Sequence, residues 1–329
     1  MTRIWKESST FRRLWGSQHV GDLRLILMCV ILMMIVSPIL LWNFAPAAKP
    51  EDQVRQLLTF LAGDLTIGGT IVAWAYQSAS KRLGVVDLFA CEIVTLCRVC
   101  TVVDAAHHLI DGFKNLAVSQ PAGPDAGKPP TDFGRFTSRE DYFPVFGQNA
   151  SDLQILEADV VTNVTAFYTY MKALRDYMRQ LGELQGETSL DQRRGILLNV
   201  IYMLFLGFES ARKAINDLVE FQPTRAEDKI TILLTELPAY GFLLGHYFGN
   251  DAHKARLALR KETYRREVGE VLSKLGSRHG PHWDKAKSLA PELTLRYEQV
   301  FRSAAAQPEK PENPTGPVIA TTHGHRNAA

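Results

Sequence analysis

Residues 25–44 read LILMCVILMMIVSPILLWNF, and this stretch contains no charged side chain. The hydrocarbon core of a bilayer is about 30 Å thick and an α-helix rises about 1.5 Å per residue, so a helix of about 20 apolar residues spans it. The stretch therefore predicts a first transmembrane helix. A cleaved signal peptide is the alternative, but its apolar region is typically about 7 to 15 residues long, and Trp42 suits an interfacial anchor.

Residues 57–77 predict a second transmembrane helix of similar length, although Asp64 lies near its middle. The residues between the two helices, 45–56, contain Pro46, Pro50 and several charged side chains, which stop the first helix and require water. We expect a short periplasmic loop there. The N-terminal part of the chain is therefore predicted to be a transmembrane helical hairpin.

Basic side chains flank this predicted hairpin unevenly. Those before the first helix are Arg3, Lys6, Arg12, Arg13 and Arg24, those in the loop are Lys49 and Arg55, and those directly after the second helix are Lys81 and Arg82. Short segments rich in Lys and Arg stay on the cytoplasmic side of a membrane. We therefore expect a multi-pass protein of the bacterial inner (plasma) membrane with both termini in the cytoplasm, including the N-terminal segment 1–24.

Composition excludes several classes of function. The formal net charge is only +2, which argues against a dedicated nucleic-acid binder. The four cysteines form no disulfide framework and are compatible with a reducing cytosol. The sequence contains no HExxH motif, phosphate-binding loop, GxGxxG motif after a strand, GxSxG elbow or kinase motif set. It therefore gives no positive reason to propose an enzyme, a cofactor or a small-molecule substrate.

No segment after the hairpin shows the alternating pattern of a β-strand. We therefore expect an all-α fold with a cytosolic helical bundle over residues 78–304. Segment 119–136 is rich in Pro and Gly and predicts a flexible linker, and the tail 305–329 is expected to be disordered. Two apolar runs, 196–208 and 230–248, are interpreted as buried core helices rather than as further spans.

Helical periodicity places two helices in the first half of this region. A long helix is expected over 83–116, directly after the hairpin, because breakers are few there. An aromatic turn at 142–146, sequence YFPVF, is expected to dock on the body. The helix that follows is strongly amphipathic. Its apolar side chains at three- and four-residue spacing are Val160, Val161, Val164, Phe167, Tyr168, Met171 and Leu174.

Capping residues and prolines place the remaining helices. Ser189 with Gln192 forms a capping box that opens a helix ending near Phe221, and Thr224 with Glu227 repeats the pattern for the next. Pro238 is expected to kink or end that second helix. The last expected helices run from about Ala239 to Leu275, with an interruption near Gly249–Asn250, and from about Pro291 to Ala304.

Asp64 is the first candidate functional residue. An ionisable group within a span costs about 2.5 to 3.5 kcal/mol on insertion scales, which makes it a functional hypothesis by default. One hypothesis is an ion-conducting oligomer organised around Asp64. The alternative is that Asp64 faces the other helix or another protomer, or lies near the outer interface in a shifted span. Gly69 and Ala73 have the spacing of a small-xxx-small helix contact that would favour self-association.

A second set of candidates lies on the helix after the hairpin. Cys97, Cys100, Asp104 and His108 supply the thiol, carboxylate and imidazole groups that transition metals use, and helical spacing brings such groups together. They predict a metal or redox sensor site. The alternative is a plain helix, because a single CxxC is a weak signal and free cysteines usually behave as small core hydrophobes.

A third candidate is the basic segment 254–278. It could lie against anionic lipid. Its Glu and Arg or Lys side chains also stand four residues apart, as in Glu262 with Arg266 and Glu270 with Lys274, and such pairs are typical of a solvated helix face. The solvated face is the favoured interpretation.

Two segments carry a resemblance to a known group of proteins. These are KRLGVVDLFACEI at 81–93 and YFPVF at 142–146, which precedes Phe167 and Tyr168. The chain here resembles uncharacterised bacterial inner-membrane proteins that join an N-terminal membrane hairpin to a cytosolic helical region. The resemblance covers about residues 20–180 and implies topology alone, since those proteins have no assigned activity.

The leading hypothesis is a non-enzymatic inner-membrane protein that serves as an interaction or scaffolding module. The lipid bilayer would hold the hairpin, and the cytosolic helices would bind a protein partner or a second copy. The alternatives are the membrane-linked sensor that uses Cys97, Cys100 and His108, and the ion-conducting oligomer that uses Asp64.

Overall fold

The computed structural model describes residues 20–44, 50–118, 143–183, 189–218, 223–246, 251–279 and 281–305. These residues form helices and short connections, with no strand among them, so the all-α prediction is confirmed. The helices are α2 (Gly21–Phe44), α3 (Pro50–Val102), α4 (Ala105–Val118), α5 (Pro144–Asn149), the 3-10 helix η2 (Ala150–Ile155), α6 (Ala158–Glu183), α7 (Leu190–Leu218), α8 (Pro223–His246), α9 (Asp251–Gly276) and α10 (Pro281–Ala305).

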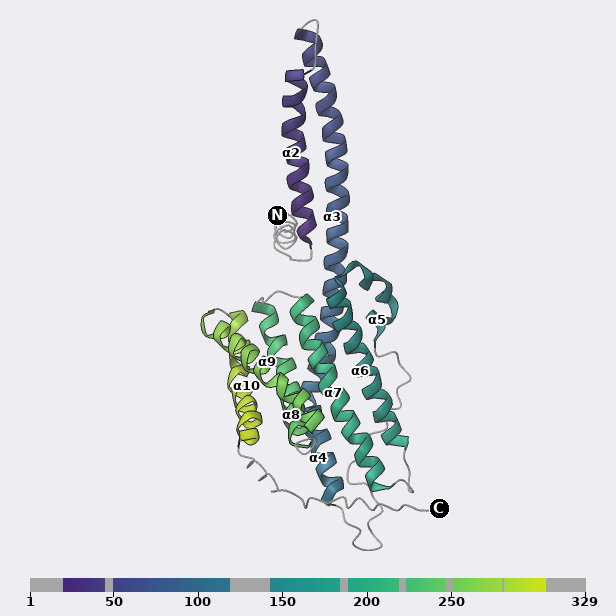
Figure 1. Ribbon diagram of the computed structural model, residues 1–329, viewed down its shortest axis with the longest axis vertical. Helices are drawn as coiled ribbons and strands as arrows, with labels where there is room; N and C mark the ends of the chain where they lie inside the picture. Colours follow the sequence, from purple (N-terminus) through teal and green to yellow (C-terminus); the bar gives the residue numbers. More distant parts are fainter. Residues whose placement is uncertain are drawn as a thin grey trace, which may run out of the picture.

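The molecule consists of a helical hairpin that projects from a helical body (Figure 1). α2 and the first half of α3 lie side by side and antiparallel, so that Asp22 at the start of α2 is 3.6 Å from Arg82 of α3. The second half of α3 continues into the body, where α4 to α10 pack around it. One helix thus belongs to both parts.

α3 is a single helix of 53 residues. Pro50 stands at its first position, where the missing N–H costs nothing, and Glu51 and Asp52 in the first turn complement the positive end of the helix dipole. No further proline occurs before Pro121, so nothing in the sequence interrupts the hydrogen-bond ladder. The sequence predicted a loop as far as residue 56 and a separate helix from Leu83. Both boundaries were wrong, because the helix begins within the predicted loop and runs on into the body.

The break between α3 and α4 falls at Asp104, which has a φ of 47°. Asp tolerates this left-handed conformation because its short polar side chain bonds locally. Here its carboxylate contacts the His107 ring at 2.7 Å, and its own N–H donates to the Thr101 carbonyl at 3.0 Å. The predicted helix over 83–116 is therefore two helices that meet at this residue.

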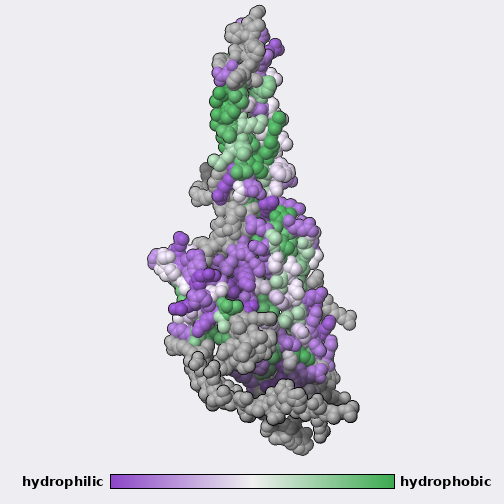
Figure 2. Space-filling model, viewed as in Figure 1, coloured by the Kyte–Doolittle hydropathy of each residue, from purple (hydrophilic) through white to green (hydrophobic). Residues whose placement is uncertain are grey.

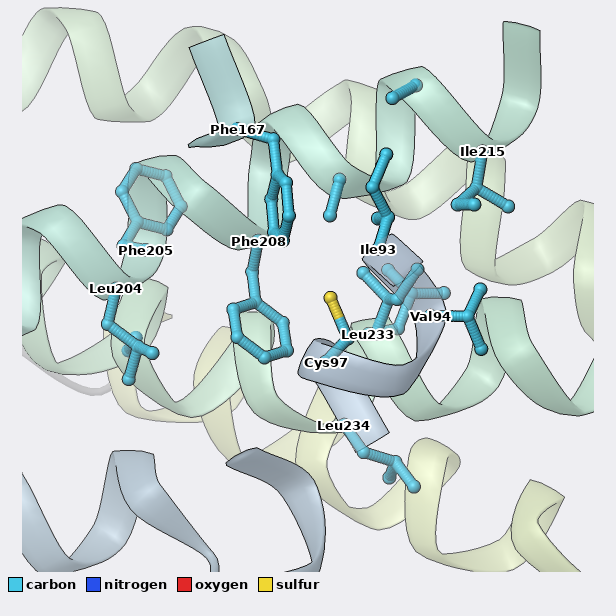
Figure 3. Close-up of a cluster of buried hydrophobic side chains, with 14 of the residues drawn as sticks. Ile93, Val94, Cys97, Phe167, Leu204, Phe205, Phe208, Ile215, Leu233 and Leu234 are labelled. Atoms are coloured by element: carbon cyan, nitrogen blue, oxygen red, sulfur yellow. The ribbon is translucent and has the colours of Figure 1, made fainter. Parts of the chain in front are cut away.

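The core is centred on α7, which is buried along most of its length. The run 196–208 lies within it and is a core helix, as the sequence predicted. The apolar stripe of α6 is also confirmed, with Val160, Val164, Phe167 and Met171 buried against this core. Figure 3 shows side chains from α3, α6, α7 and α8 meeting there; those labelled are Ile93, Val94, Cys97, Phe167, Leu204, Phe205, Phe208, Ile215, Leu233 and Leu234.

Of the two expected effects of Pro238, a kink or an end of the helix, the second is wrong, because α8 continues through Pro238 to His246. A proline has no N–H to donate, which leaves the carbonyl four residues earlier, that of Leu234, without its usual helix partner. Arg296 of α10 donates to this carbonyl at 2.6 Å. The neighbouring helix thus supplies the hydrogen bond that the proline removes.

Other predicted boundaries also shift. The Ser189 hydroxyl accepts a hydrogen bond from the Gln192 N–H at 3.2 Å, which confirms the cap of α7. α10 begins at Pro281, ten residues before the predicted start, and runs through Pro291. The predicted linker 119–136 lies outside the described residues, as does the predicted tail 305–329 except for its first residue, which ends α10.

The contact between Arg296 and the Leu234 carbonyl predicts a measurable coupling to Pro238. Arg296→Met should lower the free energy of unfolding by about 1.5 to 3 kcal/mol, the range for a hydrogen bond from a charged donor. In a Pro238→Ala background the same change should cost less, because the N–H of the introduced alanine can bond to the Leu234 carbonyl. Chemical denaturation in detergent, followed by circular dichroism, measures this coupling when it is applied to the wild type, the two single variants and the double variant. Equal losses in both backgrounds would contradict it.

Candidate functional site

Large apolar side chains point outward from both helices of the hairpin. Exposed examples are Leu25, Met28, Ile31, Leu32, Ile35, Ile39 and Leu40 of α2, and Leu58, Phe60, Leu65, Ile67 and Trp74 of α3. Figure 2 shows hydrophobic patches along the visible face of the hairpin, with hydrophilic residues at its base. A soluble monomer rarely exposes an apolar surface of this extent, which marks a site of interaction with a membrane or another protein.

The two helices of the hairpin contact each other through small and polar groups. Gly68 faces Val30, and a β-carbon at Gly68 would lie 3.1 Å from the Val30 Cγ1 atom, so glycine allows this close approach. The Ser37 hydroxyl donates to the Asp64 carboxylate, and Asp64 is only 8% exposed. Asp64 therefore faces α2, as one of the two sequence interpretations expected.

Two of the described helices are long and apolar enough to cross a membrane, judged by length and composition: Gly21–Leu40 of α2 and Leu190–Leu218, which is α7. α7 lies mostly inside the body, so its apolar character belongs to the core. The predicted second span, residues 57–77 of α3, is not among the two. Length and apolar composition alone therefore support one membrane span in the hairpin, that of α2. The second helix of the hairpin lies beside this candidate span through its contact with α2.

The residues of the predicted metal or redox site have four different environments. Cys97 lies in the core with its sulfur among Ile93, Phe208 and Leu233 (Figure 3), and burial raises the pKa of its thiol well above the ordinary value. Cys100 is partly buried, and burial raises its pKa to about 11. Burial thus disfavours the thiolate form of both cysteines, and the thiolate is the form that binds metal.

The other two residues of the predicted metal or redox site, Asp104 and His108, have different surroundings. Asp104 contacts His107 at 2.7 Å and Arg296 at 3.8 Å, while His108 is exposed. The helix breaks at Asp104, so Cys97 and Cys100 lie on α3 while His108 lies on α4. Across the described residues, no three His, Cys, Asp or Glu side chains are grouped closely enough to hold a metal ion. The structure thus does not bring Cys97, Cys100, Asp104 and His108 together.

A buried ion-pair cluster joins α7, α8 and α9. Arg212 of α7 donates through Nε to the Glu236 carboxylate at 2.9 Å and also pairs with Glu267 of α9. The Tyr264 hydroxyl donates to the other Glu236 oxygen, and Arg212 lies 5.2 Å above the Tyr264 ring. Glu236 is fully buried. Burial raises its pKa, while the charge of Arg212 and the hydrogen bonds from Arg212 and Tyr264 oppose that effect.

A second ion pair lies beside this cluster. Glu209 of α7 accepts two hydrogen bonds from Arg260 of α9, at 3.0 and 3.1 Å, and lies 3.3 Å from Lys213. Burial raises the pKa of Glu209, but the bonds from Arg260 and the charges of Arg260, Lys213 and Arg212 outweigh burial and leave the pKa below its ordinary value. Two charged pairs thus link α9 to α7.

Glu92 of α3 holds the aromatic turn against the body. Its carboxylate accepts hydrogen bonds from the Val145 N–H at 2.9 Å and the Phe146 N–H at 3.2 Å, which are free donors at the start of α5. It also accepts one from the Tyr168 hydroxyl of α6. Phe146 stacks on the Tyr168 ring with centroids 4.2 Å apart. The expected docking of this turn is confirmed, and Glu92 is the residue responsible.

Polar contacts also fix α3 against α8. Arg98 pairs with the buried Asp228 at 2.8 Å, and the Thr101 hydroxyl lies 2.8 Å from that of Thr235. Sequence reasoning did not select Arg98, nor did it select Glu92, Arg212 or Glu209. Apart from Lys213 beside Glu209, the partners described here lie 24 or more residues away in the sequence, so local spacing does not mark these pairs. The one available signal was Glu236, a lone carboxylate in an otherwise apolar run.

No family model, curated protein or solved structure matches this chain.

The buried cluster predicts a large stability effect for Arg212. Arg212→Met leaves the carboxylate of Glu236 buried without its cation, which should cost about 3 to 5 kcal/mol of unfolding free energy. The double variant Arg212→Met/Glu236→Gln removes that uncompensated charge and should recover part of the loss. Arg179→Met, in an exposed pair with Glu183, is the matched control and should leave the denaturation midpoint unchanged. Equal midpoints for Arg179→Met and Arg212→Met would contradict this account.

Glu209 predicts a pH-dependent contribution. Its pKa in the folded protein is below the ordinary value of 4.5, so its ion pairs stabilise the body above that pH, and this stabilisation is lost as the pH falls through the folded pKa. Glu209→Gln should therefore unfold at a lower temperature than the wild type at neutral pH, and the difference should shrink as the pH is lowered further and further below 4.5. Thermal unfolding in detergent at a series of pH values measures this. A difference that persists or grows in acid would contradict it.

Proposed function

We propose that the α2–α3 hairpin anchors this protein in a membrane and that the helical body serves as a non-enzymatic interaction or scaffolding module outside the lipid. The outward apolar surface of the hairpin is the single observation that carries the proposal. Burial of such a surface contributes about 25 cal/mol for each Å² removed from water, and hydrocarbon is the environment that covers both helices at once. The charged surface of the body is suited to water.

The proposed orientation places the body and both termini in the cytoplasm of a bacterial cell, with the hairpin crossing the inner membrane. Lys81 and Arg82 lie at the base of the hairpin, where α3 leaves the apolar band, and basic residues at this position favour the cytoplasmic side. Lys81 lies 3.4 Å from Asp152 of η2. The body is therefore held directly beneath the proposed lipid surface.

The construction of the body supports an interaction role over catalysis. Its buried charges, including Arg212, Glu236 and Glu209, are engaged with one another, and α3 continues from the hairpin into the core as one helix. A rigid connection of this kind fixes the body relative to the membrane, which suits a scaffold that presents a surface to a partner.

The two alternative functions gain less support. The residues proposed for a sensor are not brought together, as described above. Asp64 is the one Asp, Glu, Lys or Arg between residues 56 and 80, and its carboxylate contacts Ser37. A single carboxylate that contacts a neighbouring helix is accounted for as a packing contact within the hairpin.

The proposed topology predicts a labelling pattern with a membrane-impermeant maleimide. In a Cys29→Ala/Cys91→Ala background, Thr162→Cys on the exposed side of α6 should react from the cytoplasmic side only, in inverted vesicles. Glu51→Cys, exposed at the hairpin tip, should react from the outside only, in spheroplasts. The chain itself should stay in the membrane pellet after carbonate extraction.

The background protein without either added cysteine reports any labelling of Cys100. Two results would overturn the proposal: recovery of the chain in the carbonate supernatant, or labelling of both added cysteines from the same side of the membrane.

A further inference from the structure

α3 presents to the outside, along most of its length, a face whose centre carries no charged side chain. We call this face the α3 seam. It consists of Thr66, Thr70, Ala73, Gln77, Ser80, Gly84, Leu88, Cys91, Thr95, Val99 and Val102. All of these residues are exposed. Their spacing of three or four residues follows the 3.6-residue period of an α-helix, so they lie within an arc of about 100°. The seam crosses from the hairpin into the body without interruption.

The part of the seam within the body is apolar where a solvated helix would be polar. Leu88 is 47% exposed, Val99 58% and Val102 80%. A β-carbon at Gly84 would have no neighbouring atom within 4 Å, so another backbone can approach closely there. The Thr95 hydroxyl bonds to the Cys91 carbonyl at 2.7 Å and needs no external partner. These features are typical of a helix interface rather than of a surface in water.

The other sides of α3 are already occupied. Gly68 and Asp64, on the opposite face, contact α2. In the body, Thr101 contacts α8 and Glu92 contacts α5. None of the packing contacts described above uses the seam.

Charge and geometry select a second copy of this chain as the partner. In a parallel dimer each seam residue meets the same residue of the other copy, so a charged residue at its centre would face a like charge. The charged residues of α3 between positions 77 and 102 avoid that centre; they are Lys81, Arg82, Asp87, Glu92 and Arg98. The two at the edges of the arc, Lys81 and Arg98, pair with Asp152 and Asp228 of the same chain. A partner that follows the whole seam must also pass from lipid into water in the same direction, and a second α3 in the same membrane does so.

The seam is large enough for a specific contact. It is about 54 Å long at 1.5 Å per residue. A band about 10 Å wide along it would bury roughly 500 Å² on each copy, or about 1,000 Å² in total, which reaches the lower limit for specific interfaces.

We propose that this protein forms a parallel homodimer through the α3 seam, with the two α3 helices in register across the membrane boundary and into the body. This inference rests on the proposed membrane anchoring, since the bilayer orients the two copies in parallel. It assigns to α3 a third role, in addition to its places in the hairpin and in the core.

Cys91 is an exposed native thiol within the seam and provides a direct test. The test uses a variant that keeps Cys91 and carries Cys29→Ala, Cys97→Ala and Cys100→Ala. Membranes that contain this variant are oxidised with copper phenanthroline. A disulfide requires Cα atoms within about 7 Å, so the in-register dimer should give about tenfold or more covalent dimer than a matched Cys91→Ala/Thr162→Cys variant, whose thiol lies on α6. Equal yields from the two variants would show random collision and overturn the proposal.

A second measurement does not depend on cross-linking and leaves the native cysteines in place. Thr95→Lys puts like charges opposite each other in the seam and should convert the dimer in nanodiscs to monomer, while Thr162→Lys, on the exposed side of α6, should leave the dimer intact. Mass photometry measures whether each protein is a monomer or a dimer in the nanodiscs.

The failures can be told apart. A wild-type chain that stays in the carbonate pellet but is monomeric overturns the dimer and leaves the anchoring in place. A monomer in which Cys91 resists maleimide would show that another part of the chain covers the seam, and a cross-link to a different protein would show a different occupant; both overturn this proposal. A chain in the carbonate supernatant overturns the anchoring itself.

Discussion

The structure depends on the continuity of α3 from Pro50 to Val102. Because no proline interrupts this helix after its first residue and the acidic residues of its first turn complement the helix dipole, the hairpin and the body share one continuous helix. α2 packs on its first half, and α5, α7 and α8 pack on its second half. The position of the hairpin therefore fixes the position of the body, which would not follow from two domains joined by a flexible linker.

Polar contacts determine how the remaining helices are arranged around α3. Arg212 and Glu236 join α7 to α8, Arg260 and Glu209 join α7 to α9, and Arg296 joins α10 to the Leu234 carbonyl that Pro238 leaves free. Apolar burial drives these helices together but is not directional. Each charged pair, in contrast, has a high cost if it is misaligned in the interior, so together they favour one register of the bundle.

The helical class, the amphipathic α6 and the buried character of residues 196–208 could be predicted because each follows from a local period or run length. The residues at which α3, α8 and α10 begin or end could not be predicted from the sequence. Pro238 and Pro291 are tolerated inside helices because of tertiary packing, as the Arg296 contact shows for Pro238. The grouping of Cys97 with His108 failed for a similar reason, since it assumed a regular helix through Asp104. The buried ion pairs could not be foreseen, because they join residues that are far apart in the sequence.

The central claim is that lipid surrounds the hairpin and water surrounds the body. Trp74 on the outer side of α3 and Trp283 in α10 are natural reporters of these two environments. Each is kept as the sole tryptophan by changing the others to phenylalanine, and fluorescence is recorded in vesicles of lipids brominated along the acyl chain. The account predicts strong quenching of Trp74 and none of Trp283. Unquenched Trp74, or equal quenching of both, would contradict it.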